Sequence, residues 1–188
     1  ELEKEFGKLD WRVAFKIAEE VSFEKFCKFE NKLKAMEVSL RVALAYLTSG
    51  VVASPLEGFV RLELKKRRDG ENYFALFFSG PIRSAGGTAS TIFVAVADYI
   101  RRKHNYSVYD PDENEIKRVV SELYDYHERI TNLQYLPSSE ELEFYMKNLP
   151  VEIDGDASEK IEVSNYKDLD RVSTNFLRSG VSLVIAEG

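Results

Sequence analysis

The chain has little cysteine and little histidine: Cys27 is its one thiol, and two histidines occur among 188 residues. One thiol cannot form a disulfide within the chain, and a structural zinc site of the four-thiolate kind needs more. No apolar run approaches the ~20 residues that span a bilayer, and no signal-peptide pattern is present. These absences predict a cytoplasmic protein with no membrane partner and no cofactor of its own. Cys27 follows Phe26 in an aromatic neighbourhood, which predicts that the thiol lies in the core.

The chain also lacks an excess of positive charge. Its formal net charge is −6, from 32 acidic and 26 basic residues, which argues against a protein that coats nucleic acid. The basic residues nevertheless form two runs, at 65–68 and 101–103. Such a distribution fits a module that touches a polyanion along one edge, and it fits an ordinary charged surface equally well.

Apolar periodicity predicts helices in the first part of the chain. Asp10 and Asn31 are suitable N-caps for two helices with buried stripes, and Gly50 is expected to end the second helix. Alternation over 60–65, the turn signal Asp69-Gly70 and an apolar run over 73–78 then predict a hairpin. Its second strand is expected to be covered on both faces.

The second half is predicted to mix helices and strands. Helices are expected after residue 87, after Asp110 as an N-cap with Pro111 in the first position, and after the capping box Ser138/Glu141. Strands are expected at 151–153, 161–163 and 181–188. The predicted class is α+β, without a doubly wound parallel sheet. A helical segment, 1–50, would precede an α+β accessory domain, 51–188. The start at Glu1 and the apolar last residues predict a piece of a longer protein.

Residues 79–88, Ser-Gly-Pro-Ile-Arg-Ser-Ala-Gly-Gly-Thr, join a predicted strand to a predicted helix. Backbone N–H groups in such a loop can face an anion, and an arginine can grip a phosphate. The segment is neither a P-loop nor a dinucleotide fingerprint, so a tight packing turn is the alternative. The basic run 65–68 is expected at the tip of the predicted hairpin, where it can contact a nucleic-acid backbone or serve solubility alone. The candidate DNA- or phosphate-binding residues are Arg83, Ser84, Gly86, Gly87, Thr88, Lys65, Lys66, Arg67 and Arg68.

Two further segments are rich in polar groups. In 124–137 the lone His127 is expected to be a bonded residue near a buried stripe, and a two-histidine metal site with His104 is not expected. His104 stands beside the basic run 101–103, at the end of the helix predicted after residue 87. There it is expected to be a cation that complements the helix dipole. The residues expected to tie down a loop are His127, Arg129, Asn132 and Gln134.

Residues 152–156, Glu-Ile-Asp-Gly-Asp, place two carboxylates around a glycine, as a Mg²⁺ site requires. Asp-Gly is also a common turn dipeptide, and the remaining ligands of an EF-hand loop are missing after Asp156. A hairpin turn is therefore the predicted structure here. No catalytic residue and no metal ligand is assigned.

Three of these segments, 79–88, 125–137 and Leu149-Pro-Val-Glu-Ile-Asp-Gly-Asp156, together resemble the N-terminal region of the large, catalytic subunit of archaeal family D DNA polymerase. The stretch 31–55 is also similar. The resemblance covers nearly the whole chain but only a modest part of a much longer subunit. It implies a replicative DNA-directed DNA polymerase that works with a small subunit carrying 3′–5′ exonuclease activity.

The resemblance also implies where the chemistry lies. The family's polymerase carboxylates occupy an Asn-Ala-Asp-Phe-Asp-Gly-Asp motif downstream of this region, with which this chain shares only Asp-Gly-Asp at 154–156. Mg and Zn are therefore expected elsewhere in the full subunit. The chain is expected to be an accessory or assembly module that reaches DNA through the full subunit.

Two other interpretations stay open. The chain is alternatively a scaffold for homodimerisation or subunit docking, which predicts exposed aromatic residues among Tyr106, Tyr109 and Tyr135. A third interpretation is a small phosphate- or nucleotide-binding enzyme. That interpretation requires the glycine-rich loop to converge with Asp154 and Asp156 on one cleft.

Overall fold

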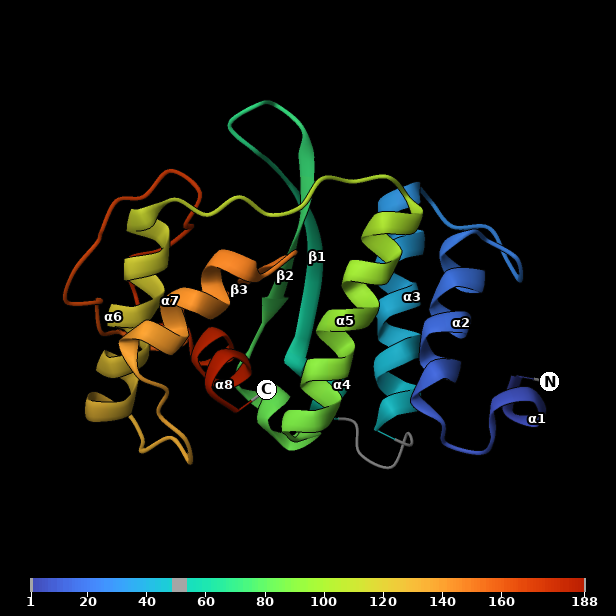
Figure 1. Cartoon of the computed structure of the whole chain (residues 1–188), viewed down its shortest axis with the longest axis horizontal. Helices are drawn as coiled ribbons and strands as arrows, with labels where there is room; N and C mark the ends of the chain where they lie inside the picture. Colours follow the sequence, from blue (N-terminus) through green and yellow to red (C-terminus); the bar gives the residue numbers. More distant parts are fainter. Residues whose placement is uncertain (1, 49–53, 188) are drawn as a thin grey trace.

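A computed structural model describes residues 2–48 and 54–187 of the chain (Figure 1). Helices α2, α3 and α5 stand side by side on one side of a central hairpin, and α6, α7 and α8 lie on its other side. The elements follow in the order α1 (Leu2–Phe6), α2 (Trp11–Ser22), α3 (Lys32–Leu47), α4 (Ser54–Gly58), β1 (Phe59–Lys66), β2 (Asn72–Phe78), the 3₁₀ helix η1 (Gly80–Ala85), α5 (Gly87–Lys103), α6 (Glu113–Arg129), α7 (Ser139–Asn148), β3 (Glu152–Asp154) and α8 (Ser179–Glu187).

The sheet has three strands in the order β1-β2-β3, with β2 antiparallel to β1 and parallel to β3. Every residue from Tyr73 to Phe78 is buried, as the apolar run predicted for a strand covered on both faces. Phe74, Leu76 and Phe78 join the core that α3 and α5 share with the sheet. The alternate residues, Tyr73, Ala75 and Phe77, pack with side chains of α6 and α7.

The predicted N-caps of the first two long helices are confirmed. Asp10 accepts a hydrogen bond from the backbone N–H of Arg12, and Asn31 accepts one from Lys34. The predicted stop at Gly50, and with it the predicted boundary between 1–50 and 51–188, lies outside the described residues. Buried side chains of α2 and α3 belong to the same core cluster as those of the sheet and α5. The division into two parts stays a prediction.

The helix predicted from Asp110 begins two residues later than expected. Asp112 caps α6 and forms a full capping box with Glu115, because the acid that completes the box stands three residues after Asp112. The carboxylate of Asp110 instead accepts from Arg171 at 2.6 Å. The box of Ser138 and Glu141 at the start of α7 is confirmed.

Two predicted strands are wrong. Residues 181–187 of the apolar run predicted as a strand over 181–188 belong to the helix α8, which is buried from Ser179 to Val184. Periodicity does not separate a fully buried helix from a buried strand. Residues 161–163 contribute only one bridge, Glu162 to Phe176. The described residues therefore hold one hairpin, and β3 joins it in parallel. The predicted α+β class is confirmed, without a doubly wound sheet.

The loop between α2 and α3 is exposed, which corrects the prediction for Cys27. The thiol is exposed, and Phe23 and Phe26 beside it are 53% and 65% exposed. The aromatic spacing around Cys27 suggested a core, but these residues lie beyond the end of α2, where the packed stripe stops. Across residues 2–48 and 54–187, every helix is too short or too polar to cross a membrane.

Two glycines allow the last part of the chain to pack against the end of β2. A Cβ added at Gly180 would lie 2.3 Å from the carbonyl carbon and oxygen of Phe78, and one at Gly155 would lie 2.7 Å from the same oxygen. Backbone atoms of a central strand cannot shift by that much without disturbing the sheet. Gly155 and Gly180 therefore fix how closely α8 and the end of β3 approach β2.

We expect Gly180→Ala to lower the free energy of unfolding by about 3 kcal/mol, because the methyl group overpacks against the Phe78 backbone. Urea denaturation with an unchanged m-value would measure the loss. Gly80→Ala is the matched control, since a Cβ at Gly80 meets only the Ser179 hydroxyl at 3.4 Å. Equal losses in the two variants would contradict the close-approach argument.

Candidate functional site

The glycine-rich loop forms an exposed turn at the start of α5. Residues 80–85 form η1, Gly86 follows with φ +76°, and α5 begins at Gly87 without a side-chain cap. The side chain of Arg83 is 42% exposed and donates to Glu187 of α8 at 3.2 Å. Ser84, Gly86 and Thr88 are exposed and Gly87 is half-buried. The loop thus presents a cation beside the positive end of a helix dipole.

The basic hairpin tip is largely paired with carboxylates and carbonyls. Lys65, predicted at the tip, is instead 15% exposed and points back into the protein. Arg67 pairs with Asp69 and Asp110, and Arg68 pairs with Asp112 at 2.8 Å. Lys66 donates to the carbonyl of Gly70. Internal pairing of this kind reduces the positive potential that the four basic residues suggested.

The loop after α6 is anchored by two of the four predicted residues. His127 Nδ1 accepts from the backbone N–H of Leu133 at 3.0 Å, and Arg129 donates to the carbonyl of Glu162 at 3.1 Å. Asn132 and Gln134 are exposed. These contacts connect the helix end to the loop that follows it and to a loop farther along the chain.

The prediction of a cationic His104 is wrong. The ring stacks on Phe23 with centroids 4.4 Å apart, and its Nε2 lies 3.0 Å from the Ser22 hydroxyl. Burial, aided by the charge of Lys32, lowers the pKa of His104 to about 4. The imidazole is therefore neutral near pH 7 and acts as a packing group between α2 and α5.

The acidic segment at 152–154 lies on the same face of the sheet as Lys65. Lys65 pairs in register with Tyr73, and Ala75 pairs with Glu152. Since side chains alternate between the two faces of a sheet, Lys65, Tyr73, Glu152 and Asp154 share one face. Lys65 Nζ lies 2.9 Å from Glu152 and 2.6 Å from Asp154, and the Tyr73 hydroxyl donates to Glu152 at 3.0 Å.

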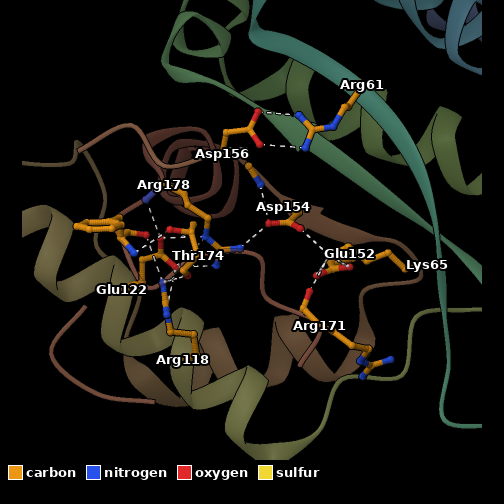
Figure 2. Close-up of polar contacts among 12 residues, drawn as sticks. Arg61, Lys65, Arg118, Glu122, Glu152, Asp154, Asp156, Arg171, Thr174 and Arg178 are labelled. Carbon is orange, nitrogen blue, oxygen red and sulfur yellow. Dashed lines mark hydrogen bonds and ion pairs between the residues drawn. The ribbon is translucent and has the colours of Figure 1, made fainter. Parts of the chain in front are cut away.

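Arg178 joins this cluster to α6 (Figure 2). Its guanidinium donates to Asp154 at 2.5 Å and to Glu122 at 2.6 and 3.1 Å. Arg118 donates to Glu122 at 3.3 Å and to the carbonyls of Thr174 and Phe176. The side chains of Arg118, Glu122, Asp154 and Arg178 are at most 2% exposed. The buried polar network therefore links β1, β3, α6 and the loop before α8.

The environment of the network shifts the pKa values of its two acids on β3, Glu152 and Asp154, in opposite directions. Burial, together with the neighbouring Asp154, raises the pKa of Glu152 to about 7 against the attraction of Lys65. Burial would also raise the pKa of Asp154, but Arg178 and Lys65 outweigh it and lower that pKa. Asp154 is thus held as a carboxylate, with cations on both of its oxygens.

The segment 152–156 is neither the predicted hairpin turn nor a metal site. Asp154 is wholly buried and bonded to Lys65, Arg178 and the N–H of Gly155. Asp156 is exposed and makes a bidentate pair with Arg61 at 2.6 and 2.9 Å. In the described parts of the chain, no group of three or more His, Cys, Asp or Glu residues could hold a metal ion. A cleft shared by the glycine-rich loop and both aspartates is excluded, because Asp154 does not reach the surface.

The residues that organise this network were missed in the sequence. Arg118 and Glu122 stand four apart on one helix, a spacing that permits an ion pair. Nothing in the sequence indicates that this pair is buried, or that Arg178 reaches it from far along the chain. Arg171, which pairs with Asp110 and Glu115 at 2.6 Å, was likewise missed.

Fold and site together define an α+β domain whose central acidic segment is neutralised by buried lysine and arginine. Within that class, the chain belongs to the family described as "DNA polymerase II large subunit DP2, N-terminal", whose profile matches residues 1–188. The resemblance stated for archaeal family D DNA polymerase is confirmed.

Several curated relatives are similar over all or most of the chain, and each is named "DNA polymerase II large subunit". The protein of Nanoarchaeum equitans is 50% identical over 188 residues, covering 100% of this chain. That of Pyrococcus horikoshii is 45% identical over 190 residues, covering 100%, and that of Archaeoglobus fulgidus is 47% identical over 176 residues, covering 94%. The chain spans only 15%, 13% and 15%, respectively, of these relatives' own length.

We expect Asp154→Ala to cost about 3–5 kcal/mol of stability, because it removes the buried carboxylate that Lys65 and Arg178 share. Lys65 would keep only Glu152 as an acidic partner, and Arg178 would keep only Glu122. Asp156→Ala, two residues away, is the matched control and should cost less than about 1 kcal/mol, since its ion pair is exposed to water. Chemical denaturation of both variants measures the difference. Similar costs would contradict the burial of Asp154 in an ion-pair network.

The raised pKa of Glu152 predicts a pH dependence of stability. An unfolded glutamate titrates near 4.5 and folded Glu152 near 7, so between these values the folded chain holds the extra proton. The free energy of unfolding contributed by this group therefore falls as pH rises from about 4.5 to about 7. His104, with its lowered pKa, acts in the opposite direction over a similar range.

The variant Glu152→Gln isolates this contribution, because His104 is present in both proteins and cancels in the difference. We expect the stability of the wild type relative to the variant to decrease as pH rises toward 7 and to level off above it. Thermal or urea unfolding at several pH values measures this difference. A difference that stays constant from pH 4.5 to 7 would show that Glu152 titrates normally.

Proposed function

We propose that the chain is a non-catalytic accessory and assembly module of the large subunit of a replicative DNA-directed DNA polymerase. Its membership in the family of DP2 N-terminal regions supports this proposal, as does the shared name of its relatives. In this proposal nucleotidyl transfer takes place elsewhere in the subunit, where Mg and Zn are bound. The small subunit of the same enzyme supplies the 3′–5′ exonuclease.

The proposal that the chain is non-catalytic rests on the acidic segment 152–156, whose two aspartates are both paired with basic side chains. Two-metal phosphoryl transfer needs carboxylates that are free to bind cations at an open site. Asp154 instead has Lys65 and Arg178 on its two oxygens and is wholly buried. Asp156 is accessible but engaged by Arg61, and one aspartate alone does not make a two-metal site.

The glycine-rich loop is the proposed contact with DNA. It combines the half-exposed Arg83 with exposed Ser84 and Thr88 at the uncapped start of a 17-residue helix. Backbone N–H groups at such a helix start favour a phosphate. The hairpin tip is a weaker candidate, because Lys65 is only 15% exposed and is paired with Glu152 and Asp154. Arg67 and Arg68 are also paired with acids.

The alternative function is a docking or homodimerisation scaffold without DNA contact. It is supported by Tyr135, which is 53% exposed. Tyr106 is half-buried, and Tyr109 is buried against Tyr73, so the expectation of exposed aromatics is wrong for Tyr109. The two functions make different predictions for Arg83. If the glycine-rich loop contacts DNA, loss of this cation weakens DNA binding, and if the chain is only a scaffold, it does not.

The test is Arg83→Gln in the complete large subunit assembled with its small subunit. We expect the KM for primer–template to rise about five- to tenfold at low salt with kcat unchanged, because one phosphate contact is lost. The slope of log affinity against log salt should also become shallower by about 1. Steady-state synthesis and fluorescence anisotropy at several salt concentrations measure both quantities.

The matched control is Arg102→Gln, which removes an exposed arginine at the other end of α5. It should leave KM and the salt slope unchanged. No change in Arg83→Gln would favour the scaffold function. A loss in kcat alone would contradict the assignment of the chain as non-catalytic.

A further inference from the structure

An apolar groove of about 360 Å³ opens between α5 and α7. Thr91 and Val94 of α5 form one wall, Tyr145 and Leu149 at α7 form the other, and Val184 and Ile185 of α8 form the floor. The three helices lie next to one another around this position (Figure 1). None of the residues that line the groove belongs to the glycine-rich loop, 79–88, or to the ion pairs of the buried polar network.

Three of the polar groups on the groove wall are already used within the chain. The Thr91 hydroxyl donates to the Gly87 carbonyl, the Tyr135 hydroxyl donates to Glu141, and the Asn148 amide donates to the Phe144 carbonyl. Sites for small ligands usually present a few free polar groups that orient the ligand. The groove is better suited to apolar side chains of a polypeptide.

Aromatic side chains gather at the rim of the groove. Tyr135 is 53% exposed, Tyr145 is 45% exposed, and Phe144, whose ring centroid lies 6.4 Å from that of Tyr145, is 66% exposed. Phe and Tyr are enriched at protein interfaces, and Tyr is among the residues that carry most of the binding energy there. A rim of this composition around an apolar floor indicates a surface that another polypeptide segment covers.

The family of the chain indicates which segment that is. The matching family is an N-terminal region, and the chain spans only 13–15% of the relatives cited above. In those subunits most of the polypeptide therefore follows the position of α8, which is the floor of the groove. A segment tethered at this floor has an effective concentration of order millimolar, so it fills the groove ahead of a free partner of equal affinity.

We propose that the groove between α5 and α7 binds an apolar segment of the same large subunit, from the part that follows α8. This inference rests on the proposed function, because it requires the chain to belong to a longer subunit. The chain then docks onto its own subunit through Tyr135, Tyr145 and the α8 floor. Residues 79–88 of the glycine-rich loop do not line the groove, so docking there does not occupy them directly.

The test places the photo-cross-linker p-benzoylphenylalanine at position 145, in place of Tyr145, in the complete large subunit assembled with its small subunit. After irradiation, mass spectrometry identifies the joined peptides. The expected product is an internal cross-link to residues of the same polypeptide beyond α8. A cross-link to the small subunit, a cross-link between two large subunits, or the absence of any cross-link would overturn the proposal.

Two further variants separate specific docking from general effects. The same label in place of Lys117, which is exposed on α6 away from the groove, should give no such internal cross-link. Thr91→Trp, which fills the groove from an exposed position, should reduce the yield from position 145 at least fivefold, and Lys117→Trp should not. DNA synthesis by the labelled enzyme is measured in parallel, so a failure of the docking inference is distinguishable from a failure of the proposed function.

Discussion

The buried guanidinium of Arg178 is the interaction on which the rest of the structure depends. It is held by Glu122 of α6 and by Asp154 of β3, and Asp154 in turn binds Lys65 of β1. Buried charges are costly unless each is paired and hydrogen-bonded. The pairing therefore requires α6, β1, β3 and the start of α8 to take one relative position, since any other leaves a charge unpaired inside the protein.

That requirement explains the other unusual features of this half of the molecule. Gly155 and Gly180 let the backbone on both sides of the network approach Phe78 closely enough for Arg178 to reach its partners. Two arginines hold the irregular loop before α8 in place. Arg118 of α6 donates to two carbonyls of the loop, and Arg171 of the loop donates to Asp110 and Glu115 near the start of α6. These polar contacts hold the loop in place where regular secondary structure is absent.

Much of the fold could be predicted from local signals. Caps at Asp10, Asn31 and Ser138, the Asp69-Gly70 turn and the apolar run of β2 all act within a few residues, and the structure agrees with them. Predictions failed where distant residues decide the outcome. Residues 181–187 form a buried helix, and an apolar run that is buried on nearly every side carries no period that separates it from a strand. The acidic segment belongs to a buried ion-pair network because Lys65 and Arg178 reach it from distant parts of the chain. At the candidate site, the sequence located the exposed glycine-rich loop, whereas the pairing of the basic hairpin depends on tertiary contacts with Asp110 and Asp112.

The parallel pairing of β2 with β3 also has a consequence for how the chain folds during synthesis. The hairpin of β1 and β2 can form early, because its strands are adjacent in sequence. Its partner β3 and the cation Arg178 leave the ribosome only after α5, α6 and α7 have been made. Until then Lys65 has no acid from β3 beside it, and one edge of β2 is unpaired. The N-terminal helices and the hairpin are therefore expected to assemble first, with the exposed edge of β2 as the point at which a stalled nascent chain is most prone to aggregate.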